Sequence, residues 1–242
     1  MLVLVGRMHL LLTLGAALAA PSRTAPITID ITPVTELCLS GRSDGAAWTA
    51  ALASEGLAPA LTDGQATLLL CATTLRFGGR TFHESVLSVA VAEPDGADGA
   101  FLVGAYNTVR FYAWVERRRN RSPYTHARID LVPVEAPSLT VTGEQVIWSA
   151  RQGPRPGGTA REDASFDGPI YLPSVDGHGG WFYAQLEGEA QITPYDPAVD
   201  GFSLGPPGAD PLRDRLGEVG FEPLFWSLRP AARHAKSDTQ DR

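Results

Sequence analysis

Lysine is almost absent from this sequence. Of the 20 basic residues in the 242-residue chain, 19 are arginine, and the single lysine is Lys236. It lies in the polar stretch "KSDTQDR", which we expect to be part of a disordered tail. The folded part of the chain is therefore predicted to contain no side-chain amine, which excludes imine chemistry there.

Positive charge is also in short supply. Acidic residues outnumber basic ones, so the formal net charge is −7. Nucleic acids are bound through a broad basic face that displaces counterions from the phosphates. The charge balance therefore argues against a nucleic-acid partner.

Residue patterns for metals and cofactors are missing. The chain has two cysteines, Cys38 and Cys71, and none of its histidines forms a pair at helical ligand spacing. Phosphate loops and dinucleotide fingerprints are absent too, so we expect no metal and no cofactor. Two cysteines in an exported chain are compatible with one disulfide, if their strands are antiparallel neighbours. Two buried free thiols are the alternative.

No apolar run in the sequence is long enough to span a bilayer as a helix. The run "LLLTLGAALAA" follows Arg7 and contains an Ala17-Leu18-Ala19 cleavage pattern, which is typical of a secretory signal. We expect residues 1–19 to be a signal peptide and residues 20–26 a leader. The protein is then exported to the periplasm or the extracellular space. If the start codon is misassigned, a cytoplasmic location is expected instead.

Short runs typical of extended chain dominate the rest of the sequence and predict strands. These runs cover 27–31, 66–77, 84–92, 100–106, 110–115, 127–134, 144–150 and 181–192. Two segments, 43–57 and 210–220, predict helices that begin at N-capping residues. We predict one α+β domain over 27–230, with a mainly antiparallel sheet closed or folded on itself, and a tail over 231–242.

The segment "GFSLG" at 201–205 matches the nucleophile-elbow pattern of serine hydrolases. That elbow needs a helix directly after the serine, whereas Pro206-Pro207-Gly208 follows here and prevents a helix from starting. We interpret the match as coincidental.

Four arginines fall within five positions of this acidic chain, in the stretch "VERRRNRSPYTHARIDL" at 115–131. Charge runs are usually solvent-facing, and mutual repulsion keeps such side chains apart. Alternatively, one or two of the guanidinium groups clamp a carboxylate, which their planar geometry suits. The sequence leaves both interpretations open.

Two segments together resemble motifs of the acetoacetate decarboxylase family. "TFHES" (81–85) carries an aromatic-x-Glu-Ser step around Glu84, and "NRSPYTHARI" (120–129) corresponds to a later Pro-Lys-Lys motif of the family. Pro123 matches the proline, and Tyr124 lies 40 residues after Glu84, which is the spacing of the family. The resemblance extends over roughly the whole predicted domain. It implies a β-barrel that closes into a cone with a few flanking helices.

The departures from the family's motifs bear directly on chemistry. The two motif lysines, which form an imine with a keto acid and activate that amine, are replaced by Tyr124 and Thr125. A second acid of the family's site corresponds to Leu69, so Glu84 alone remains of that chemistry. Imine-dependent decarboxylation is therefore excluded by the sequence, even where the fold is shared.

The resemblance implies that a small organic acid binds in the barrel. The expected catalytic residues are Glu84, Tyr124 and His126, and the expected ligand-binding residues are Arg117, Arg118, Arg121 and Arg128. Three functions stay open: binding of a keto acid or similar ligand, an acid–base lyase, dehydratase or cyclase step, and a lipocalin-like carrier or structural protein. The expected partner is a small molecule, and a homo-oligomer is compatible with the sequence.

Overall fold

The computed structural model describes residues 24–92, 98–154, 160–163, 165–175 and 177–242. The signal peptide expected over 1–19 and the first residues of the expected leader lie outside these ranges. In the part of the chain that is described, no helix is both long and apolar enough to cross a membrane.

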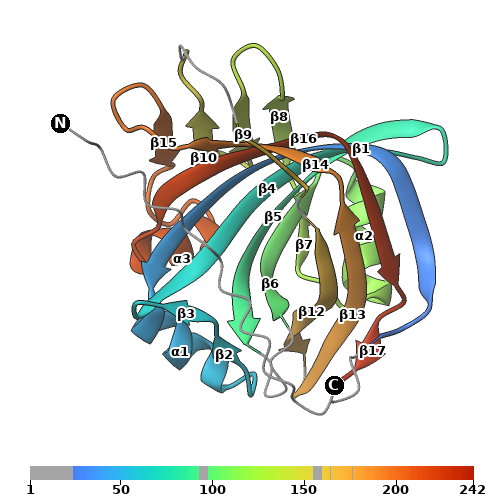
Figure 1. Ribbon diagram of the computed structural model, residues 1–242. Coiled ribbons are helices and arrows are strands. Elements are labelled where there is room, and N and C mark those ends of the chain that lie inside the picture. The colour runs from blue at the N-terminus through green and yellow to red at the C-terminus, as the bar shows by residue number, and fades with distance from the viewer. Residues whose placement is uncertain (1–23, 93–97, 155–159, 164, 176) are drawn as a thin grey trace.

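A curled sheet of long strands forms the body of the fold (Figure 1). In spatial order its main strands are β16 (Glu222–Ser237), β1 (Ile27–Asp44), β4 (Gln65–Phe77), β5 (Arg80–Ala92), β6 (Asp98–Asn107), β12 (Phe166–Val175) and β13 (His178–Glu187). Strand β13 also pairs with β16, so the sheet closes into a ring. These neighbours are antiparallel except for β6 and β12. The sheet confirms the predicted α+β class with a mainly antiparallel, barrel-like sheet.

Shorter strands border the ring or form a second sheet beside it. Those attached to the ring are β2 (Ala58–Pro59), β3 (Leu61–Thr62), β7 (Tyr124–His126), β11 (Ala160–Asp163), β14 (Glu189–Pro194) and β17 (Gln240–Asp241). The second sheet contains β15 (Gly201–Leu204), β10 (Val146–Arg151), β9 (Ser138–Thr142) and β8 (Arg128–Val132) in that order.

The second sheet and two helices cover one face of the ring strands and bury the main hydrophobic core. The helices are α1 (Gly45–Ala53) and α3 (Pro211–Glu218). Trp48 of α1, Trp148 of β10 and Leu216 of α3 belong to this core and are at most 1% exposed. Each helix starts at an aspartate whose carboxylate accepts backbone N–H bonds. The cap of α3 is Asp210, as the sequence predicts, and the cap of α1 is Asp44, where the sequence left Ser43 as an alternative. The side chains on the opposite face of the ring strands do not belong to this core.

A tight turn joins β4 to β5 and sets the register of the strand that carries Glu84. Gly78 and Gly79 both have positive φ, at 57° and 78°, as a two-residue hairpin turn with the correct twist requires. The register that results places Thr73 of β4 opposite Glu84 of β5.

The segment 110–115, predicted as a strand, is instead the start of the helix α2 (Arg110–Arg119). A short apolar run such as "RFYAWV" fits either structure when only its periodicity is considered. Strands β6 and β7 are parallel neighbours, so the chain between them must cross over, and a helix is the usual crossover element. A helix could be predicted here only from the pairing of β6 with β7, and no local sequence pattern reveals that pairing.

The segment 231–242, expected to be a disordered tail, is also part of the folded structure. Strand β16 continues to Ser237, where Lys236 pairs in register with Ala184 of β13, and β17 adds a further pairing of Gly180 with Asp241. These pairs close the ring, so the only lysine of the chain lies in its wall. The polar composition of this segment hides three buried positions in β16, which are Ala232, Ala235 and Ser237.

Candidate functional site

A row of polar side chains crosses four neighbouring strands on the face of the ring that does not carry the main core. Glu36 pairs with Thr73, Thr73 with Glu84, and Glu84 with Asn107. Directly paired residues point to the same face of a sheet, so all four side chains lie on one face. The residues next to them in sequence, such as Leu37, point into the core on the other face. A polar belt therefore crosses the inside of the ring.

The carboxyl group of Glu84 lies at the centre of a buried hydrogen-bonded group. Its Oε1 accepts a bond from Nδ2 of Asn107 at 2.8 Å, and its Oε2 accepts one from the hydroxyl of Tyr124 at 3.2 Å. Asn107 is fully buried and Tyr124 is 8% exposed. The side chains of Glu84 on β5 and Tyr124 on β7 thus meet, and both are residues for which we expect a catalytic role from the sequence.

Burial raises the pKa of Glu84 above its usual range. The charge of Lys236 and the hydrogen bonds of Asn107 and Tyr124 act in the opposite direction, while the charge of Glu116 adds to the rise. Burial, followed by the charge of Glu84, also raises the pKa of Tyr124 well above its ordinary value, so this phenol stays protonated as a donor. A carboxyl with a raised pKa keeps its proton to a higher pH than an ordinary glutamate and is therefore a better candidate for a general acid.

An ion pair lies beside this group. The Nζ atom of Lys236 is 2.8 Å from Oε1 of Glu116 in α2 and lies 5.5 Å from the centre of the Phe182 ring. Asn120 donates to the other oxygen of Glu116 at 2.9 Å. The side chains of Lys236 and Glu116 are 27% and 16% exposed, so solvent reaches the pair.

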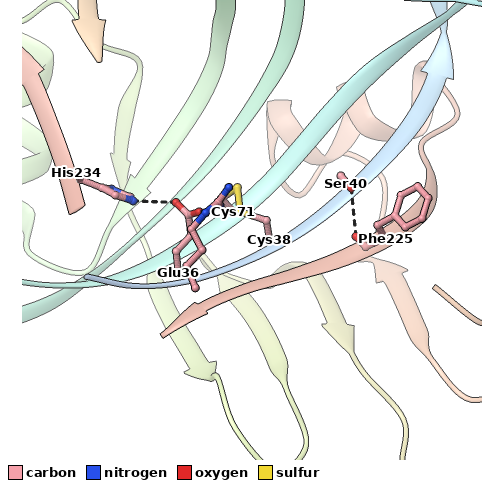
Figure 2. Close-up of a disulfide and its surroundings, with 7 residues drawn as sticks. Glu36, Cys38, Ser40, Cys71, Phe225 and His234 are labelled. Atoms are coloured by element: carbon pink, nitrogen blue, oxygen red, sulfur yellow. Dashed lines mark hydrogen bonds and ion pairs between the residues drawn. A yellow bond between two sulfur atoms is a disulfide. The ribbon is translucent and has the colours of Figure 1, made fainter. Parts of the chain in front are cut away.

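A second buried charge cluster surrounds Glu36. Its side chain is 4% exposed, and its carboxylate contacts Arg229 and, at 3.0 Å, Nε2 of His234 (Figure 2). Burial alone raises the pKa of Glu36, but the hydrogen bond and charge of His234, followed by those of Arg229, outweigh burial and hold the pKa below its usual range. The carboxylate of Glu36 is therefore held between the guanidinium group of Arg229 and the imidazole of His234.

The two cysteines lie next to this cluster and form a disulfide between β1 and β4 (Figure 2). Cys38 and Cys71 are direct partners in the antiparallel register, as the disulfide hypothesis required. Among the described residues, Glu36, Cys38 and Cys71 are the one group of metal-type ligands that lie within 4.8 Å of one another. Because the two sulfurs are bonded to each other, we assign this group a structural role.

The other expected site residues lie apart from Glu84. His126 and Arg117 line a groove between α2 and β7. Arg121 forms an exposed ion pair with Asp241. The remaining two expected arginines do not reach the ring interior either: Arg118 is exposed on α2, and Arg128 pairs with Asp130 on β8. The structure therefore separates the predicted single site into a ring interior and an outer groove.

This outer groove, which we call the α2–β7 groove, has a volume of about 490 Å³. Helix α2 contributes Arg110, Trp114 and Arg117, and β7 contributes Tyr124 and His126. Tyr124 belongs to both places, because its ring lines the groove and its hydroxyl bonds to Glu84.

Sequence reasoning missed four residues of the ring interior: Glu36, Asn107, Glu116 and Lys236. Glu36 gave a local signal, because it is an acidic residue among the buried positions of "VTELCL". Lys236 and His234 are two positions apart in a strand and so share a face, but their segment was interpreted as a tail. Asn107 and Glu116 come together with the others only through strand pairing and the crossover helix.

The serine of "GFSLG" has no hydrolase geometry. Ser203 lies on β15 and its Oγ shares a hydrogen bond of 2.8 Å with Oγ of Ser149. The next helix, α3, begins only at Pro211. The absence of a helix directly after the strand agrees with the interpretation of this motif as coincidental.

The fold is similar to that of solved acetoacetate decarboxylases. One acetoacetate decarboxylase superposes with a TM-score of 0.63 at 15% identity, covering 94% of this chain and 95% of the other. The enduracididine biosynthesis enzyme MppR, solved in complex with pyruvate, gives 0.59 at 13%, covering 90% of each chain. An acetoacetate decarboxylase-like enzyme from Sphingomonas wittichii RW1 gives 0.58 at 14%, covering 88% of this chain and 92% of the other. No family model and no curated protein matches the sequence.

These similarities establish an acetoacetate decarboxylase-like fold for this chain. At such low sequence identity they show the architecture, while the chemistry has to be argued from the side chains inside the ring.

Proposed function

We propose that the chain binds a small organic acid inside the ring, beside Glu84, and that Glu84 exchanges a proton with the bound ligand. The observation that supports this most directly is the partly buried carboxyl of Glu84, which is held by Asn107 and Tyr124 and has a raised pKa. A carboxylic acid in such surroundings serves as a general acid when protonated and as a base when ionised. The proposed reaction class is an acid–base lyase, dehydratase or cyclase step.

The positive charge for the ligand's carboxylate would come from Lys236. Its ammonium is partly exposed and already faces one carboxylate, that of Glu116. The positive charge of Lys236 then acts on two acidic side chains, Glu84 and Glu116, and a bound anion adds a third negative charge. The charges balance best when Glu84 is protonated, because like charges in one site disfavour ionisation. Ligand binding should therefore be accompanied by uptake of a proton at Glu84.

His126 has no part in this proposal, since it lines the α2–β7 groove. The partner of Glu84 is Tyr124, whose hydroxyl would orient the carboxyl through the bond to Oε2. Tyr124→Phe removes a bond that lowers the pKa of Glu84, so the variant should bind the ligand up to a higher pH than the wild type.

The position of Lys236 also means that imine formation has to be considered again. The sequence argument against an imine assumed that the folded body contains no amine, and the structure places Lys236 in the ring wall. Attack on a carbonyl needs the lone pair of Nζ, however, and this atom is engaged by Glu116. We therefore retain the lysine as a charge partner for an organic acid and expect no stable imine.

A thermal-shift screen tests the proposal, with pyruvate, acetoacetate, hydroxy acids and fatty acids as probes. A ligand at 100 times its dissociation constant stabilises the fold by about 2.7 kcal/mol, which is easily measured. We expect a keto or hydroxy acid to stabilise the wild type and also Glu84→Gln, because glutamine mimics the protonated carboxyl. Lys236→Gln should lose most of that effect. Stabilisation by fatty acids alone would support a lipocalin-like carrier and contradict the proposal.

A further inference from the structure

We propose that the α2–β7 groove is a second binding site, which takes a planar aromatic acid with an anionic group at each end. The site adjoins the ring interior at Tyr124, but neither Glu84 nor Lys236 lines it, so the inference does not depend on the function proposed for the ring interior. Its residues are Arg110, Trp114 and Arg117 on α2 and Tyr124, Thr125 and His126 on β7.

The groove concentrates unpaired positive charge on an acidic protein. Within the described ranges, neither Arg110 nor Arg117 forms an ion pair, whereas Arg121 and Arg128 each have an aspartate partner. Seven positions separate Arg110 and Arg117, which is close to two helical turns, so both lie on one face of α2. None of the residues that line the groove is acidic. An anion would therefore be attracted from both ends without a competing carboxylate.

An exposed indole lies between the two arginines. Trp114 follows Arg110 by four positions and precedes Arg117 by three, so it occupies the same helical face. Its side chain is 52% exposed and stacks on Phe111, with a centroid distance of 6.0 Å and an interplanar angle of 24°. Phe111 supports the indole in this orientation, and the part that lines the groove can stack on a flat ring.

The spacing of these groups sets the chemical class of the ligand. Along the helix axis the two arginines are about 10 Å apart, at about 1.5 Å per residue. A planar aromatic dicarboxylate can stack on Trp114 and present one carboxylate to each guanidinium, a geometry that suits arginine better than lysine. The exposed Thr125 and His126 on the opposite wall supply further polar contacts.

Isothermal titration calorimetry of the purified protein with terephthalate tests the site. We expect saturable binding that weakens with added salt, since exposed charges are screened. Arg110→Gln, Arg117→Gln and Trp114→Ala should each weaken binding by about tenfold or more. Arg118→Gln and Arg119→Gln are matched controls, because both arginines are exposed on the same helix but do not line the groove. They should change the dissociation constant by no more than about twofold, as expected for screened surface charges.

Two comparisons distinguish this site from simple charge attraction and from binding in the ring interior. Cyclohexane-1,4-dicarboxylate carries the same charges without a flat ring and should bind at least about tenfold more weakly than terephthalate. Glu84→Gln should change the dissociation constant of terephthalate by no more than about twofold, because Glu84 does not line the groove and touches it only through Tyr124. The proposal is overturned if terephthalate shows no saturable binding, if the control arginines matter as much as Arg117, or if the saturated acid binds equally well. Loss of binding in Glu84→Gln would also overturn it, by showing that the two places are one site.

Discussion

The Nζ atom of Lys236 lies 2.8 Å from Oε1 of Glu116, which joins the last long strand of the ring to the crossover helix α2. The charge of Lys236 acts on the neighbouring Glu84, whose pKa it lowers against the effect of burial. The only side-chain amine of the chain is thus one member of a group of three ionisable residues inside the ring. This group carries the function that we propose.

The first prediction concerns Lys236 as an amine. Incubation with pyruvate or acetoacetate and borohydride, followed by intact mass measurement, should give no stoichiometric adduct, because Glu116 engages Nζ. Glu116→Gln removes the carboxylate partner of Lys236, so this variant tests whether that contact is what prevents an adduct. An adduct mapped to Lys236 in the wild type would show that the amine reacts as a nucleophile and would replace the acid–base proposal.

The second prediction concerns the stability of Glu84→Gln as a function of pH. The pKa of Glu84 is raised in the folded protein, so its stabilising contribution is complete at low pH and is lost as pH rises through the folded-state pKa. Glutamine has no such loss and can keep the bonds to Asn107 and Tyr124. The free energy of unfolding of the variant relative to the wild type should therefore increase between pH 4 and pH 8. A difference that stays constant over this range would show that the pKa of Glu84 is not raised.

The third prediction concerns the buried charge cluster around Glu36. Glu36→Gln leaves Arg229 with an unpaired buried charge and should lower the free energy of unfolding by roughly 3 kcal/mol in urea titrations. Because the pKa of Glu36 is lowered, its contribution is present above the usual carboxyl range and is lost as pH falls through the folded-state pKa. Glu222→Gln, which breaks the exposed pair with Arg42, is the control and should leave stability almost unchanged.

The fourth prediction concerns the disulfide. Cys38 and Cys71 enclose a loop with a sequence separation of 33 residues, for which the chain-entropy model gives about 3–4 kcal/mol of stabilisation. The double variant Cys38→Ser/Cys71→Ser should lose that amount in urea unfolding while it keeps its far-ultraviolet circular dichroism spectrum. Two free thiols in the non-reduced wild type, measured by mass labelling, would be inconsistent with this account.

The strands and two of the helices could be predicted because their signals are local. The apolar run around Cys71 and the capping aspartates Asp44 and Asp210 each specify an element within a few residues of sequence. Helix α2 could not be predicted in this way, because its conformation follows from the parallel pairing of β6 with β7.

The candidate site was only partly predictable for the same reason. Glu84 and Tyr124 were identified from a resemblance in motif spacing, and the structure brings them together at 3.2 Å. Lys236 and Glu116 are separated by 120 positions and meet only because β16 closes the ring. A polar segment near the end of the chain gives no local sign of such a closure, so a disordered tail was the natural prediction.

The most direct test of the central claim measures proton uptake when an organic acid binds. Calorimetric titrations of pyruvate in two buffers with different ionisation enthalpies give the number of protons taken up per ligand. We predict a net uptake in the wild type that decreases as pH falls below the pKa of Glu84, and no uptake in Glu84→Gln. Binding without proton uptake, uptake that persists in Glu84→Gln, or no binding at all would contradict the role assigned to Glu84.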